Sequence, residues 1–369
     1  MKNNSLPGIP LIESPFFAAW LEELRVEDPE LVPVAEQLHT QGFAVLRFPD
    51  PDFDARAERI KTSLHPLYDW AGHRENPGRG LRLQDAWKTH EDVKSLAVNE
   101  RVLQILGRLY GRRAIPFQTL NFPVGTQQHY HSDAIHFSSV PERFMCGVWV
   151  ALEDIDETAG PLEYYVGTHQ WPIYTNEHTG RSYVPGQKVS QEVYHNAWQD
   201  LVARTQPQKQ TFTARKGDAL IWCANLLHGG APQTNPDRTR WSQVTHYYFE
   251  NCVYYTPMLS EPFKGLIHYR QITDVTTGNP VPNICNGQVV DPKFIEQSIV
   301  RGRESLLPEK EFDAEYYLQE NPDVAGAGVA AYEHYKEHGI REGRPGVRKR
   351  QGSIPGRVAQ LLSLGRRTE

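Results

Sequence analysis

Residues 216–249, KGDALIWCANLLHGGAPQTNPDRTRWSQVTHYYF, contain the pattern that decides the fold. Gly217 and Asp218 form a turn signal, and Ala219–Cys223 is a short apolar run typical of a buried strand. A loop rich in Pro, Asn and Asp then leads to a second strand-like run, Arg240–Phe249. Short strands separated by such turns are typical of antiparallel β-structure.

The same pattern extends back to residue 115. Further strands are expected at Ile115–Phe122, Phe144–Leu152 and Leu162–Val166. Short strands at this spacing predict a sandwich or barrel, such as a jelly roll. The segment Pro172–Gln208 interrupts the pattern with aromatic and polar residues, and it is either a lid over a site or an elaborated loop.

Helices are expected before this strand-rich region. Helical patterns occur at Val34–Gln41, Phe53–Leu64, Val93–Leu96 and Val102–Tyr110. Gly42 and Gly111 are placed to end two of these helices, and Phe43–Phe48 predicts a strand. Residues 65–88 are rich in Gly, Arg, Trp and Pro and predict a long surface loop.

The character of the chain changes again after Arg301. The segment FDAEYYLQENPDVAGAGVAAYEHYKEHGIREGR predicts short helices. We therefore expect a domain over residues 1–300, a small helical module over 301–350 and a basic tail over 351–369. Residues 341–369 hold eight Lys or Arg against two Glu, which is typical of a solvated tail but also suits an anionic partner or membrane surface.

The composition fits a globular protein. Of 369 residues, 39% are hydrophobic and 23% charged, which excludes a disordered chain, and the net charge of −6 argues against nucleic-acid binding. The longest clear apolar run, Phe144–Leu152, is shorter than the ~18 residues of a membrane span, so no transmembrane segment is expected. The N-terminus lacks the apolar stretch of a signal peptide. The four cysteines lie far apart, like thiols of a reducing compartment, and a cytoplasmic protein is predicted.

The histidine-rich segment QQHYHSDAIHF, residues 127–137, offers a metal site. His131 and Asp133 lie two residues apart, so on a strand both side chains would point to one face. An imidazole nitrogen and a carboxylate oxygen suit Fe(II), which would take a third ligand from elsewhere to complete a facial triad. The segment therefore predicts part of an iron site.

A His-x-acid sequence is not specific by itself, since this chain contains three of them. His73 lies in the predicted surface loop, where nothing fixes the direction of its side chain. His90 precedes a predicted helix, where Thr89 or Asp92 more simply serves as a cap. Only His131 and its partner acid lie in the strand-rich region.

The third ligand is expected from the quoted segment 216–249, where His228 is the best candidate. Arg240 and Ser242 share one face of the following strand. If that face is buried, the arginine needs an anion. Beside an iron, this pair would bind the distal carboxylate of a dicarboxylate such as 2-oxoglutarate. Arg238 is a rival for the same role.

Four ordered motifs resemble the phytanoyl-CoA dioxygenase (PhyH)-like Fe(II)/2-oxoglutarate-dependent oxygenases over roughly residues 33–250. They are His131-Ser132-Asp133, residues 151–172, residues 216–230, and Arg240 followed by His246-Tyr247. The resemblance implies a mainly β protein with flanking helices around a double-stranded β-helix (jelly-roll, cupin-like) core. It also implies iron on His131, Asp133 and His228, 2-oxoglutarate held by Arg240, and O2 as the further substrate. The register relative to His246-Tyr247 favours Arg240 over Arg238.

Further roles follow from the same resemblance. Trp149 matches a position that lines the co-substrate in related enzymes, and Ser242 and Asn121 are carried over on strand parity and proximity to the motif. Asp133 stands where related halogenases have a small residue, which favours hydroxylation. The flanking residues His129 and His136 are expected to face substrate or support the ligands. His169 is expected to organise a loop rather than to bind a metal.

The resemblance implies a dioxygenase that hydroxylates an unactivated C–H bond of a small molecule, with release of succinate and CO2. The C-terminal segment resembles a helical module of bacterial glycosyltransferases and other cell-surface polysaccharide proteins, which favours a sugar or glycoconjugate substrate. One alternative is a non-catalytic jelly-roll binding or scaffold protein of a surface-polysaccharide assembly. Another is a cupin-like metal isomerase or epimerase, which needs neither oxygen nor Arg240.

Overall fold

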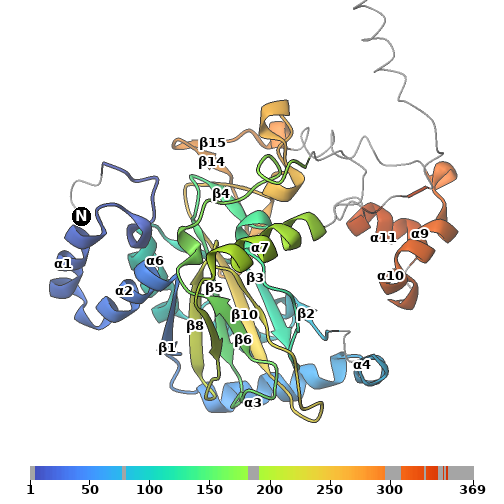
Figure 1. Ribbon diagram of the computed structural model, residues 1–369, viewed down its shortest axis with the longest axis horizontal. Coiled ribbons are helices and arrows are strands. Elements are labelled where there is room, and N and C mark those ends of the chain that lie inside the picture. Colours follow the sequence, from blue (N-terminus) through green and yellow to red (C-terminus); the bar gives the residue numbers. More distant parts are fainter. Residues whose placement is uncertain are drawn as a thin grey trace, which may run out of the picture. The chain divides into compact units, whose positions relative to one another are not determined.

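The computed structural model describes residues 5–76, 80–181, 191–295, 309–327, 330–339, 344 and 346–347. The chain divides into two compact units (Figure 1). The described part of the first unit ends at Ile295, and that of the second begins at Glu309.

Two antiparallel sheets form the centre of the first unit. The larger sheet has six strands in the order β1-β8-β5-β10-β3-β2, and the smaller has three in the order β7-β6-β9 (Figure 1). Neighbouring strands in both sheets are far apart in sequence, as in a jelly roll. The strands are β1 Phe43–Arg47, β2 Leu83–Gln84, β3 Ala114–Phe122, β5 Met145–Ala151, β6 Leu162–Tyr165, β7 Lys209–Phe212, β8 Asp218–Cys223, β9 His228–Gly230 and β10 Ser242–Phe249.

The two sheets pack face to face through large apolar side chains. Phe43 of the larger sheet contacts Tyr164 of the smaller with ring centroids 4.2 Å apart, and Trp149 contacts Phe212 at 5.7 Å. All of these side chains belong to one buried cluster. This arrangement confirms the predicted double-stranded β-helix core.

Helices cover the other face of the larger sheet. Successive residues of each strand point to opposite faces of the sheet. The side chains on the helix-covered face therefore form a separate buried cluster, which includes Ala44, Val148 and Ile221. In α6 the buried residues recur at helical spacing, which gives this helix one apolar face. The described helices of the first unit include α1 Phe17–Glu27, α2 Val32–Gln41, α3 Phe53–Leu64, α4 Trp70–Glu75, α5 Glu91–Ala97, α6 Glu100–Tyr110 and α7 Glu192–Thr205.

Three short two-stranded sheets complete the first unit: β4 Ser138–Val140 with β11 Val253–Tyr255, β12 Ile272–Thr273 with β13 Pro280–Val281, and β14 Ile284–Cys285 with β15 Gln288–Val289. The second unit contains α9 Ala314–Glu320, α10 Pro322–Ala327, α11 Ala331–His334 and a π-helical turn, Tyr335–Gly339. Tyr317, Val324 and Tyr335 form its small core. The domain boundaries at residues 300 and 350 stay predictions, and the predicted basic tail 351–369 lies outside the described residues.

Most expected elements are present within a residue or two of their predicted ends. The predicted surface loop is wrong in part, because the described residues of 65–88 include α4 and β2. Asp69 begins α4, since its side chain accepts a hydrogen bond from the amide of Gly72 at 2.9 Å. The helix α1 has no counterpart among the helices predicted from the sequence. Among the described residues, none of the helices combines the length and apolar character needed to span a membrane.

Gly42 provides a test of how α2 joins β1. It ends α2 in the left-handed conformation, with φ at 84°, and an added Cβ would overlap the ring of His169. Gly42→Ala should lower the free energy of unfolding by about 1–2 kcal/mol for the conformation and a further ~1–3 kcal/mol for the overlap. Gly278→Ala is the control, because Gly278 has φ at 73° but open space around it. Equal losses in denaturant unfolding would contradict the predicted overlap.

Candidate metal centre

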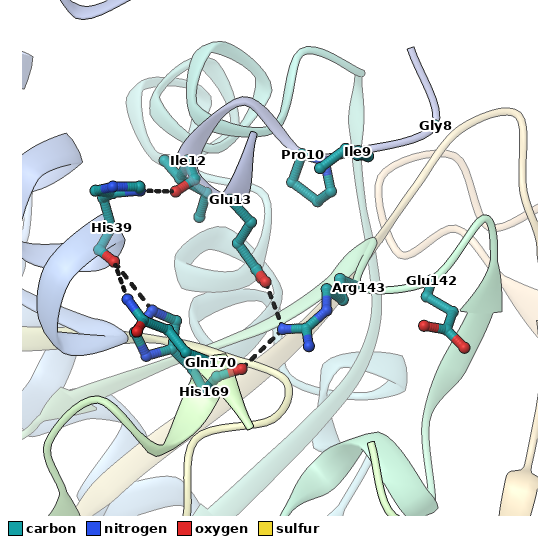
Figure 2. Close-up of a pocket in the computed structure, with 10 residues that line it drawn as sticks. All are labelled: Gly8, Ile9, Pro10, Ile12, Glu13, His39, Glu142, Arg143, His169 and Gln170. Atoms are coloured by element: carbon teal, nitrogen blue, oxygen red, sulfur yellow. Dashed lines mark hydrogen bonds and ion pairs between the residues drawn. The ribbon is translucent and has the colours of Figure 1, made fainter. Parts of the chain in front are cut away.

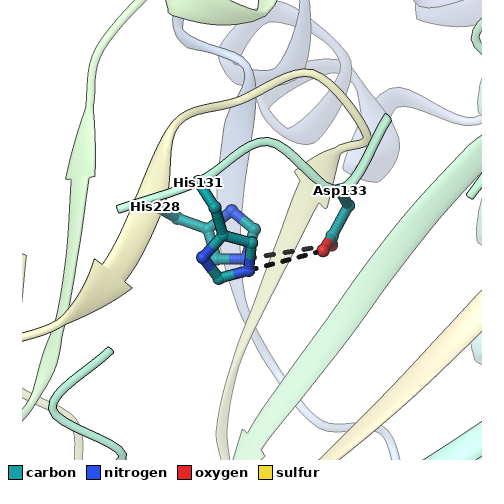
Figure 3. Close-up of side chains that lie close together, drawn as sticks. All are labelled: His131, Asp133 and His228. Atoms are coloured by element: carbon teal, nitrogen blue, oxygen red, sulfur yellow. Dashed lines mark ion pairs between the residues drawn. The ribbon is translucent and has the colours of Figure 1, made fainter. Parts of the chain in front are cut away.

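Three metal-ligating side chains converge in the first unit. His131 Nε2 lies 3.6 Å from Asp133 Oδ1, and His228 Nε2 lies 3.8 Å from Asp133 Oδ2 (Figure 3). One ligand atom from each residue lies within 4.8 Å of the others. Two imidazole nitrogens and one carboxylate oxygen within this reach form the donor set of a facial triad, which leaves positions open for other ligands. The site could therefore hold a divalent metal ion.

Backbone pairing brings these residues together. His131 and His228 form an isolated antiparallel bridge, with N–H···O distances of 2.8 and 3.0 Å. Asp133 does not continue a strand but begins a 3₁₀ turn, Asp133–Ile135, which Ser132 caps. The expectation that His131 and Asp133 share a strand face is thus wrong. A bridge followed by a tight turn, rather than strand parity, directs both side chains to one point.

Hydrogen bonds fix the orientation of both imidazoles. His131 Nδ1 lies 3.1 Å from the carbonyl oxygen of His129, and His228 Nδ1 lies 3.0 Å from that of Leu226. A carbonyl oxygen only accepts, so each Nδ1 carries the proton and donates it. Each Nε2 therefore faces Asp133, which is the side from which a metal would bind.

The protonation states also suit metal binding. Burial raises the pKa of the Asp133 carboxyl, but His228 and His131 outweigh this effect and hold that pKa well below its ordinary value. Burial lowers the pKa of His228 to about 4, so this imidazole is neutral near pH 7. For His131, burial lowers the pKa, but the hydrogen bond with Asp133 more than offsets it and raises the pKa overall. Asp133 and His228 are therefore in the form that binds metal, whereas His131 would give up a proton when its Nε2 becomes a ligand.

Trp222 holds the carboxylate in place and was not identified from the sequence. Its indole Nε1 donates a hydrogen bond of 2.9 Å to Asp133 Oδ2. Gly147 lies under this indole, where an added Cβ would overlap the ring. Because Oδ2 accepts this bond, Oδ1 is the oxygen left freer for a metal. The only signal in the sequence was parity, since Trp222 lies on the inner face of a predicted strand.

His246 is a further imidazole beside the centre. Its Nε2 lies 3.8 Å from Asp133 Oδ2, and its Nδ1 lies 3.0 Å from Gln118 Oε1. It lies four residues after Ser242 on the same face of β10. Its place behind the carboxylate suits support of Asp133 rather than a fourth ligand.

Arg240 lies two residues before β10 and is almost fully buried, with 1% of its surface exposed. Its Nη1 donates to the carbonyl oxygen of Gly160 at 3.2 Å, and Nε has no partner. Among the described residues, Arg240 forms no ion pair with a carboxylate. Burial lowers the pKa of Arg240 to about 10, which leaves it charged near pH 7. A buried cation of this kind calls for an anion.

Two other buried donors lie on the inner face near Arg240. Trp149 Nε1 and Ser242 Oγ have no hydrogen-bond partner. Both side chains lie on the same face of the sheet, since Val244, two residues after Ser242, pairs directly with Trp149. Buried polar atoms are almost always hydrogen bonded, so three unpartnered donors in one region fit an oxygen-rich anion. Arg238 instead lies at the surface, where it pairs with Asp156 at 2.9 Å.

Asn121 does not lie with these residues. Its register partner is Gln243, and its Nδ2 donates to Gln243 Oε1 at 3.2 Å, on the helix-covered face of the sheet. The prediction that Asn121 contacts the co-substrate is therefore wrong, because its side chain lies on the opposite face of the sheet from Ser242. The surface sequence around His90 is also no metal site, because Asp92 pairs with two arginines, Arg56 and Arg59.

The remaining histidines lie around the centre or apart from it. His129 is exposed and lies 5.7 Å from His195 of α7, which places part of the Pro172–Gln208 segment beside the motif. His169 Nε2 bonds to the carbonyl oxygen of His39 at 3.1 Å and so ties a loop to α2. His169 also lines a pocket of about 590 Å³ that contains the partly buried Glu13–Arg143 ion pair (Figure 2). None of the three converging ligands lines that pocket.

Comparison with known proteins identifies one family. Residues 41–241 match the family described as phytanoyl-CoA dioxygenase (PhyH). No curated protein matches the sequence. Among solved structures, the chain is similar to the non-haem α-ketoglutarate-dependent epimerase SnoN from nogalamycin biosynthesis, at 18% identity and a TM-score of 0.47, over 62% of this chain and 86% of that one.

Two further solved structures are similarly distant. The α-ketoglutarate-dependent carbocyclase SnoK, also from nogalamycin biosynthesis, has 16% identity and a TM-score of 0.47, over 67% of this chain and 92% of that one. EctD from S. alaskensis, with 2-oxoglutarate and 5-hydroxyectoine, has 16% identity and a TM-score of 0.43, over 60% of this chain and 76% of that one. Likenesses at this level indicate nothing about the substrate.

The Trp222 bond to Asp133 predicts an effect on metal affinity. Trp222→Phe removes the indole donor while keeping an aromatic ring, and the affinity for Co²⁺ or Fe²⁺ should fall about 10–100-fold. Trp241→Phe is the matched control, because Trp241 is equally buried but packs in the cluster on the helix-covered face. Anaerobic metal titration measures both. Equal affinities in the two variants would show that Trp222 does not support the ligand.

Proposed function

The chain belongs to the phytanoyl-CoA dioxygenase family, whose enzymes use Fe(II), 2-oxoglutarate and O2, and we propose that it hydroxylates an unactivated C–H bond of a small molecule. One O2 and one 2-oxoglutarate are consumed, and one oxygen atom enters the substrate as hydroxyl while the other enters succinate, with release of CO2. The observation that supports this most is the convergence of His131, Asp133 and His228 within 4.8 Å.

In this proposal those three residues hold Fe(II). The donor set fits, because two oriented imidazoles and an ionised carboxylate occupy one side and leave the other open. Bound iron, together with 2-oxoglutarate and O2, supplies the oxidising power for attack on a C–H bond. The chain itself contributes orientation: carbonyl oxygens fix His131 and His228, and the indole of Trp222 fixes the carboxylate.

Arg240 binds the distal carboxylate of 2-oxoglutarate. Its guanidinium offers the two parallel donors that read a carboxylate, and it has no competing acid among the described residues. Ser242 Oγ and Trp149 Nε1, both without a partner, lie where they would add hydrogen bonds or line the co-substrate. The buried, low-dielectric surroundings strengthen these interactions and keep water away from the co-substrate.

We extend the proposal to the substrate and the location. The resemblance of the C-terminal segment to modules of surface-polysaccharide proteins favours a sugar or glycoconjugate, and the basic tail would then contact an anionic partner or membrane surface. All four cysteines are free, which suits a reducing compartment such as the cytoplasm.

The metal role predicts loss of a defined activity. Wild-type protein with Fe(II) and 2-oxoglutarate should develop a weak visible absorption band without oxygen and should release succinate under air. His131→Ala should abolish both, since one of the three ligands is removed. His90→Ala, in another His-x-acid sequence whose acid is paired with arginines, should leave both unchanged. A wild-type protein that forms neither the band nor succinate would contradict the proposal.

The anchor role predicts a selective loss of co-substrate affinity. Arg240→Gln leaves the carboxylate of 2-oxoglutarate unpaired, which should cost about 2–5 kcal/mol, or roughly 30- to 3,000-fold in Kd. Arg238→Gln should change Kd less than about fivefold, because exposed ion pairs contribute little. Titration of the Fe(II) complex with 2-oxoglutarate compares the two. A larger rise in Kd for Arg238→Gln than for Arg240→Gln would contradict the proposal and make Arg238 the residue that binds the carboxylate.

A further inference from the structure

A second arginine lies near the metal centre and has no part in the function proposed so far. Arg270 extends over Phe137, with its guanidinium carbon 4.6 Å from the ring centroid. The ring of Phe137 lies in turn 5.1 Å from that of His246, whose Nε2 is 3.8 Å from Asp133. A single aromatic ring therefore separates the guanidinium from the imidazole that supports the metal-ligating carboxylate.

Arg270 is held in place but its charge is not neutralised. Its Nη1 donates to Thr256 Oγ1 at 3.2 Å and to the carbonyl oxygen of His136 at 3.5 Å. Its backbone amide donates to the carbonyl oxygen of Tyr254 at 2.8 Å, which fixes the residue beside β11. In the part of the chain that the structure describes, it forms no ion pair with an acid, and its buried Nε has no partner.

Tyr248 provides a second unpartnered donor in this region. Its side chain is fully buried, and its hydroxyl makes no hydrogen bond within the described residues. Its ring stacks on Phe117 at 4.3 Å, and Phe117 packs against Phe137 at 5.6 Å. Burial raises the pKa of Tyr248, so its hydroxyl stays protonated. The charge of Arg270 acts in the opposite direction on this pKa, so the two groups interact electrostatically.

His136, whose carbonyl oxygen accepts a hydrogen bond from Arg270, adds no positive charge near pH 7. Burial lowers the pKa of its imidazole to about 4, and the charge of Arg270 acts in the same direction. A negatively charged group that enters this region meets one permanent cation, Arg270, beside apolar aromatic rings.

We propose that Arg270, with the hydroxyl of Tyr248, binds an anionic group of the substrate, a carboxylate or a phosphate, and so places a neighbouring C–H bond at the metal centre. This inference rests on the proposed function. It assigns the two arginines different ligands: Arg240 takes the co-substrate, and Arg270 takes the substrate. The aromatic rings of Phe137 and Phe117 then contact the apolar part of the molecule next to its charged group.

The test uses small probes on the full-length protein. Butanoate and butyl phosphate represent the two anionic groups, and butanamide is the neutral control of the same shape. Binding is measured as a saturable rise in melting temperature at constant ionic strength, with saturating 2-oxoglutarate and Co²⁺ present. We expect at least one anion to bind wild-type protein, and butanamide to bind at least tenfold more weakly. The better of the two anions identifies the group.

The variants separate this site from that of Arg240. Arg270→Gln should weaken probe binding at least tenfold while leaving the affinity for 2-oxoglutarate within threefold of wild type. Arg240→Gln should do the reverse, and Tyr248→Phe should weaken probe binding without loss of melting temperature. Arg270→Lys keeps the charge and should restore part of the binding lost in Arg270→Gln.

The outcomes distinguish the two proposals. Probe binding that is absent in wild type, or equal in wild type and Arg270→Gln, overturns the inference even if succinate is formed. Failure of wild type to form succinate overturns the proposed function, whereas anion binding that still depends on Arg270 would then stand as a separate site. If Arg270→Gln loses both probe and 2-oxoglutarate affinity in parallel, the residue is structural and the inference is wrong.

Discussion

The backbone bridge between His131 and His228 is the contact on which the site depends. These residues are far apart in sequence, and their two N–H···O bonds of 2.8 and 3.0 Å set the spacing of the imidazoles. The same bridge positions the 3₁₀ turn that directs Asp133 between them. A shift of one residue in this pairing would turn one imidazole away from the other, because successive side chains of extended backbone point to opposite sides. The smaller sheet holds that register in place, because His228 in β9 also pairs with Tyr164 of β6.

Several buried polar side-chain atoms in the described residues have no hydrogen-bond partner, and four of them lie on or beside two neighbouring strands. Arg240 Nε, Ser242 Oγ, Trp149 Nε1 and Tyr248 Oη are buried without partners, and all belong to β5, β10 or the residues leading into β10. Such atoms destabilise a folded protein unless a ligand completes their hydrogen bonds. Their concentration near the candidate metal centre is what a binding site for polar molecules requires.

The charges around the centre are divided between two arginines. Arg240 is almost fully buried near the loop of Gly160, whereas Arg270 is partly exposed and lies over Phe137. These two guanidiniums are positive charges that attract anions. One deep and one shallower cation would bind two different anionic groups in separate places. This arrangement suits a reaction in which a dicarboxylate co-substrate must be held apart from the molecule it oxidises.

Sequence alone determined the strand-rich core, its flanking helices and the identities of the converging side chains. Alternation, turn residues and glycine placement are local, and β5, β8, β10, α2, α3, α5 and α6 follow from them. It could not place Asn121, Trp222, His246 or Arg270, because their roles depend on which strands pair and in which register. Asn121 was assigned to the wrong face, and the spacing of His131 and Asp133 suggested a strand where the chain makes a turn. Only the tertiary structure decided these points, because contacts between segments a hundred residues apart are set by the packing of two sheets and leave no periodic trace in the sequence.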